Sequence, residues 1–145
     1  MTDVRNTSFS WPKKLPFIKK VGLGAGILVG LSAASPFVKF WFFNNPSYLS
    51  LLNYSVTLGI IVLVCGAVGC ILSVLGKYAF CLIPGTVSLG AVAAYHITLH
   101  KMLLSTGPIE ISRLFVKQDT GYYLLIIGTV GLIAVGAVGV LIRTN

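Results

Sequence analysis

Four long apolar stretches dominate this sequence, and each is long enough to cross a membrane. They occupy residues 21–43, 55–76, 78–100 and 122–142. A helix rises about 1.5 Å per residue, so about 22 residues reach about 33 Å, against a hydrocarbon core about 30 Å thick. The predicted fold is therefore all-α: a polytopic membrane protein built as a four-transmembrane-helix bundle.

The composition leaves no room for a separate soluble domain. Hydrophobic residues make up 56% of the 145 residues and charged residues 10%, whereas a soluble domain is about a quarter charged. We therefore treat 1–145 as a single membrane domain, with a basic tail over 1–20 and outer loops over 44–54 and 101–121. No stretch carries a catalytic, nucleotide or metal signature, so we expect no enzymatic activity and no cofactor.

Basic residues are numerous and unevenly distributed. Lys and Arg total 11 against 3 Asp and Glu, which gives a net charge of +8. Because the basic residues flank apolar stretches, we expect them to orient helices and contact anionic lipid, with no nucleic-acid partner. Four spans place seven basic residues on the side of both termini, so the positive-inside rule predicts that this side is cytoplasmic or an equivalent inner compartment. The seven are Arg5, Lys13, Lys14, Lys19, Lys20, Lys77 and Arg143, and the four on the other side are Lys39, Lys101, Arg113 and Lys117.

The first apolar stretch leaves two alternatives open, because Pro36 interrupts it. Residues 21–35 alone reach about 22 Å, which is short for a crossing. We therefore expect the helix to continue with a kink through Pro36 to Phe43, which puts the aromatic residues of 37–43 in a belt at the outer membrane surface. In the alternative, the helix ends near Ser35 and an interfacial segment follows.

Glycines recur at helical spacing in three of the four stretches. Helices in lipid associate by close packing of small residues, because lipid tails are as apolar as leucine side chains. The stripes suffice for packing within the bundle, and their number also favours membrane-protein partners or a homo-oligomer. The predicted helix-packing glycines are Gly22, Gly26, Gly30, Gly66, Gly69, Gly128, Gly131 and Gly139.

The two histidines are the strongest candidates for chemistry. His96 and His100 are four residues apart, which places them on one helix face. They are candidate cofactor-binding residues, as haem ligands or quinone contacts. We predict no metal site, because zinc needs three or four protein ligands. In a structural interpretation, His96 instead forms a hydrogen bond with a neighbour such as Tyr95, Tyr122 or Thr98.

The expected function is that of a non-enzymatic structural or assembly subunit of a larger membrane complex. None of the three acidic residues lies inside an apolar stretch, which disfavours transport coupled to protons or sodium. Two alternatives stay open: a channel or small-solute transporter, and a redox anchor that holds haem or quinone near His96 and His100.

Overall fold

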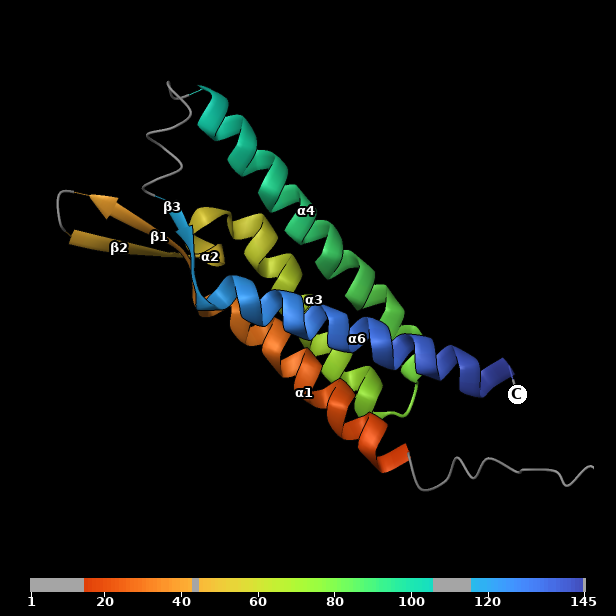
Figure 1. Ribbon diagram of the computed structural model, residues 1–145. Coiled ribbons are helices and arrows are strands. Elements are labelled where there is room, and N and C mark those ends of the chain that lie inside the picture. The colour runs from red at the N-terminus through yellow and green to blue at the C-terminus, as the bar shows by residue number, and fades with distance from the viewer. Residues whose placement is uncertain (1–14, 43–44, 106–115, 145) are drawn as a thin grey trace, which may run out of the picture.

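Long helices form most of the described part of the protein (Figure 1). The computed structural model describes residues 15–42, 45–105 and 116–144, and in these ranges four helices are long and apolar enough to cross a membrane. Four apolar helices of this length indicate a multi-pass membrane protein, as the sequence predicts. The helices are α1 (Leu15–Ala34), α3 (Val56–Val74), α4 (Leu82–Ser105) and α6 (Thr120–Thr144).

The first helix differs from the prediction at both ends. α1 ends at Ala34, so the predicted helix over 21–43 is wrong, and the alternative of an end near Ser35 is confirmed. Pro36 has no backbone N–H and disfavours a helical conformation in the residue before it. α1 gains its length at the other end, because it begins at Leu15, inside the predicted tail. Its 20 residues reach about 30 Å, which is enough to cross the hydrocarbon core.

A three-stranded antiparallel sheet follows α1, and the all-α prediction did not include it. β1 (Pro36–Phe42) pairs with β2 (Asn45–Ser50) on one side and with β3 (Val116–Gln118) on the other. β1 is rich in aromatic and β-branched residues, which favour extended backbone once the proline has ended the helix. The predicted loops 44–54 and 101–121 therefore contain two of the three strands.

Short local contacts set the ends of the remaining elements. α2 (Leu51–Tyr54) is a single turn, and the Ser55 hydroxyl that follows it accepts a hydrogen bond from the Leu58 N–H at 3.4 Å, which caps α3. After α3 the chain turns at Gly76, whose φ of +72° lies in the left-handed region that glycine favours. A 3-10 helix, η2 (Tyr78–Cys81), then leads directly into α4.

The sheet lies at the opposite end of the molecule from the start of α1 and the end of α6. Figure 1 shows the start of α1, the turn before η2 and the end of α6 at one end, which we call the terminal end, and the sheet at the other, which we call the sheet end. α1 packs along α3 and α6, and α4 packs against the same two helices. The larger hydrophobic core lies toward the sheet end and includes Phe37, Tyr95 and Tyr122.

Candidate functional site

The predicted packing glycines lie at contacts between helices. For all of them except Gly30, a Cβ atom added to the glycine would lie against a neighbouring element. A Cβ on Gly26 would lie 2.9 Å from the Gly66 carbonyl oxygen, and a Cβ on Gly66 would lie 2.5 Å from the Gly30 amide nitrogen. α1 and α3 therefore approach one another backbone to backbone. Of the others, Gly22 faces α3, Gly69 faces α6, Gly128 and Gly131 face α1, and Gly139 faces η2.

Several further glycines make close contacts that the sequence analysis missed. Gly59 lies against α2, Gly85 against α6 and Gly136 against α4. Gly121 is the most informative, because a Cβ there would lie 2.8 Å from the Pro36 carbonyl oxygen. This contact fixes the start of α6 beside the junction of α1 and β1. Nothing in the local sequence marks Gly121, because its partner lies far away in the chain.

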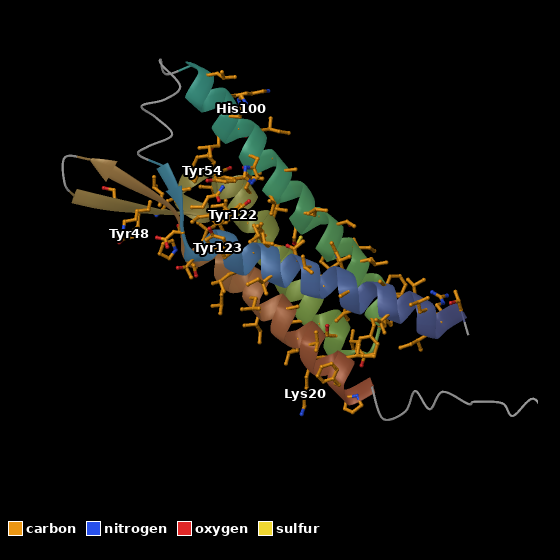
Figure 2. The ribbon with its side chains drawn as sticks, viewed as in Figure 1. Lys20, Tyr48, Tyr54, His100, Tyr122 and Tyr123 are labelled. Carbon is orange, nitrogen blue, oxygen red and sulfur yellow. The ribbon has the colours of Figure 1, made fainter. Side chains whose placement is uncertain are left out.

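His96 and His100 both lie on α4, but the structure gives them different surroundings. The Nε2 atom of His96 lies 2.7 Å from the Tyr122 hydroxyl oxygen, a hydrogen bond that joins α4 to α6. Tyr122 was one of the partners predicted for His96, and that interpretation is confirmed. Because this bond engages Nε2, haem ligation through that nitrogen would require breaking it. Both histidines are exposed, and His100 lies farther along α4, away from Tyr122 (Figure 2).

The described acidic and cysteine side chains do not gather around the histidines. The Asp119 carboxylate accepts hydrogen bonds from the N–H of Thr120 at 2.7 Å and from its hydroxyl at 3.1 Å, at the start of α6. Over residues 15–42, 45–105 and 116–144, no three His, Cys, Asp or Glu side chains are grouped so that they could hold a metal ion. The cysteines are free thiols: Cys65, Cys70 and Cys81.

Aromatic rings gather at the sheet end, where the strands meet the helices (Figure 2). Tyr95 is at their centre, with its ring centroid 4.9 Å from that of Phe37, 5.5 Å from that of Tyr54 and 6.1 Å from that of Tyr122. The Phe37 and Tyr95 planes are inclined at 84°, the edge-to-face arrangement that aromatic pairs favour. These rings join β1, α2, α4 and α6. We call the group the aromatic cluster: Phe37, Tyr54, Tyr95, His96, Tyr122 and Tyr123.

Two hydroxyl groups in the aromatic cluster, those of Tyr54 and Tyr95, are buried and have no hydrogen-bond partner among the described residues. Tyr95 is 0% exposed, and Tyr54 is half-buried with its oxygen pointing inward. Burial raises the pKa of the Tyr54 phenol, because the phenolate would lose its hydration. Most other buried hydroxyls bond to a carbonyl oxygen of their own helix, as Ser73 and Ser88 do. The aromatic cluster is therefore the candidate site.

The side chain of Phe37 does not lie in the aromatic belt that the sequence predicts over 37–43. The side chain is 0% exposed and packs inside the aromatic cluster, so its assignment to the membrane surface is wrong. Phe37 is in an extended strand that begins at the helix ends, which turns its ring inward against Tyr95 and Tyr122. No local signal in the sequence marks Tyr54 as a member of the aromatic cluster, because the placement of α2 brings it to Tyr95.

Comparison with models of protein families, with curated proteins and with solved structures found no match for this chain. Inference about function therefore depends on the geometry of the described residues.

Replacing His96 with alanine is expected to lower the free energy of unfolding by about 1–2 kcal/mol, because the Tyr122 hydroxyl loses its partner. Unfolding of the purified protein in mixed detergent micelles, followed by circular dichroism, measures this change. His100→Ala is the control, since His100 is also exposed on the same helix but lies away from Tyr122; its effect is expected to stay within about 0.5 kcal/mol. Loss of function in His96→Ala with an unchanged unfolding curve would favour the redox anchor instead.

Proposed function

We propose that this protein is a small non-enzymatic integral membrane protein, a bundle of four transmembrane helices that acts as a structural or assembly subunit of a larger membrane complex. The observation that carries the proposal is a sheet attached directly to the helix ends. Only Ser35 separates α1 from β1, only Asp119 separates β3 from α6, and Phe37 is buried among the helices. A sheet held in this way offers a partner a surface of defined shape.

β2 is the part of this sheet best suited to bind a partner. Within the part of the chain that the structure describes, β2 pairs with β1 on one side only. An edge strand presents backbone N–H and C=O groups to a strand from another chain. Tyr48 of β2 is 53% exposed, with the Lys39 ammonium 5.2 Å from its ring centroid. Exposed tyrosine is typical of protein interfaces.

The helices also offer outward-facing glycines. A Cβ on Gly24 of α1 or on Gly90 of α4 would meet no atom within 4 Å. Glycines at such positions let the backbone of another helix approach closely. A partner helix, or a helix of a second copy of this chain, would fit there, while the inward-facing glycines hold the bundle together.

Purification from its own membrane in a mild detergent tests the proposal. The expected result is a stoichiometric companion protein or a defined homo-oligomer. Gly24→Leu and Gly90→Leu are matched variants, because a Cβ at either site meets no atom of the described residues within 4 Å. They are expected to leave unfolding unchanged while weakening any contact with a partner helix. A monomer that purifies without a companion would contradict the proposal.

We also propose that both termini lie on the cytoplasmic side or in an equivalent inner compartment. Exposed basic residues at the terminal end support this orientation under the positive-inside rule: Lys19, Lys20, Lys77 and Arg143 (Lys20 in Figure 2). Epitope tags at the two chain ends are expected to resist protease added to sealed cells or vesicles, whereas a tag inserted within 106–115 is cleaved. Cleavage of one terminal tag alone would contradict an even number of spans, and cleavage of both would reverse the orientation.

A further inference from the structure

The aromatic cluster contains two hydroxyl groups whose hydrogen bonds are not accounted for. The oxygen atoms of Tyr54 and Tyr95 are both buried, and neither has a partner among the described residues. A buried hydroxyl without a partner is unfavourable, because it has lost its hydrogen bonds to water and gained none. Phenylalanine at either position would supply the same ring without this penalty.

A tyrosine hydroxyl cannot gain a hydrogen bond to its own helix by rotation of the side chain. Thr129 also has a buried hydroxyl without a partner, but a threonine oxygen lies close to its own backbone and can turn toward a carbonyl oxygen of its helix. Ser32 does this already, with its oxygen 2.6 Å from the Val29 carbonyl oxygen. A phenol oxygen lies at the far end of a rigid ring, so its partner has to come from elsewhere.

The two hydroxyl groups belong to neighbouring rings. Tyr54 comes from α2 and Tyr95 from α4, with their ring centroids 5.5 Å apart and their planes inclined at 69°. The Phe37 ring also packs against Tyr95, with the ring centroids 4.9 Å apart. A single small group that reached both oxygens would satisfy both.

We infer that the aromatic cluster binds a small guest whose oxygen atom forms hydrogen bonds with the hydroxyl groups of both Tyr54 and Tyr95. The guest chemistry is one oxygen centre of minimal volume, because the surrounding rings are in contact. Two sources supply it: a buried water molecule, which typically makes about three hydrogen bonds to otherwise unpaired groups, or an oxygen of a membrane phospholipid that reaches in from the head-group region.

Phenylalanine variants distinguish a bound guest from two unpaired hydroxyl groups, because the two cases predict opposite signs. Tyr54→Phe and Tyr95→Phe keep the ring and remove only the oxygen. With a guest present, each variant is expected to raise the equilibrium constant for unfolding about fivefold, since one hydrogen bond is lost. The double variant is expected to raise it less than the product of the single effects, because both hydroxyls bind the same guest. Without a guest, each variant removes an unfavourable buried group, so an unchanged or smaller constant would overturn the inference.

Tyr123→Phe is the matched control, since Tyr123 is in the same cluster but is 56% exposed; its unfolding constant is expected to stay unchanged. Unfolding is measured in lipid-free detergent and again after phospholipid is added. Single-variant effects present in both conditions identify the guest as water, and effects that require phospholipid identify a lipid oxygen. Single effects that multiply independently would overturn the shared guest. Wild-type elution from a size-exclusion column establishes that each variant has folded.

Discussion

Replacing Gly66 with alanine is expected to lower the free energy of unfolding by about 3 kcal/mol, because the added methyl group has no space between α1 and α3. It would lie 2.5 Å from the Gly30 amide nitrogen and 2.8 Å from both the Gly26 carbonyl oxygen and the Gly30 Cα. All three are backbone atoms within a helix, so none can rotate away as a side chain would. The two helices have to separate along their length. Detergent-induced unfolding, followed by circular dichroism, measures the loss.

Gly24→Ala and Gly90→Ala are the matched controls for this prediction. They make the same chemical change at glycines where a Cβ meets nothing within 4 Å. Alanine is a better helix former than glycine by up to about 1 kcal/mol, so these variants are expected to be neutral or slightly stabilised. Gly26→Leu is expected to be at least as damaging as Gly66→Ala, since its side chain would meet Cys70. An equal loss at Gly24 and Gly66 would contradict the close contact between α1 and α3.

The number and type of the long helices could be predicted from the sequence because the membrane imposes a minimum apolar length. Each of the four apolar stretches overlaps one of the observed helices. The boundaries were less predictable. In the first stretch, apolar composition continues past Pro36, while the backbone changes from helix to strand at that residue. Hydrophobicity alone does not distinguish an aromatic strand from an aromatic helix end, so the local effect of proline decides the boundary.

The sheet could not be predicted because its pairing is not local. β3 has only three residues and is far from β1 in the chain, yet Lys117 lies opposite Lys39 in the ladder. A strand this short has no detectable periodicity. It is identified only by its partner, and that partner was assigned to a helix.

The candidate site could be predicted in part, for the same physical reason. His96 and the start of the last helix were both expected at the outer end of the bundle, so Tyr122 could be named as a hydrogen-bond partner. The contact between the Tyr54 and Tyr95 rings depends on where α2 lies. Helical spacing in the sequence does not predict that position. Spacings of three or four residues predict packing glycines, whereas no spacing marks Gly121, because its contact is with the turn after α1.

Phe37→Ala is expected to lower the free energy of unfolding by about 4 kcal/mol, because it opens a cavity in the aromatic cluster. The Phe37 ring is 0% exposed and makes edge-to-face contacts with Tyr95 and Tyr122, with centroids 4.9 Å and 5.6 Å away. Its backbone carbonyl also accepts the Asp119 N–H at 3.1 Å, where β3 joins α6. Loss of the ring therefore weakens both the helix core and the attachment of the sheet. Detergent-induced unfolding measures the first effect, and limited proteolysis within residues 36–50 measures the second.

Phe17→Ala separates this packing effect from a general loss of apolar surface. Phe17 is on α1 and is 69% exposed, so its truncation creates no cavity in the protein and is expected to cost less than about 1 kcal/mol. Phe37→Leu retains most of the buried volume and is expected to fall between the two alanine variants. If Phe37→Ala and Phe17→Ala destabilised the protein equally, the aromatic cluster would not be a packed core. Faster proteolysis of the sheet in Phe37→Ala alone is the result expected if one buried ring connects the sheet to the membrane helices.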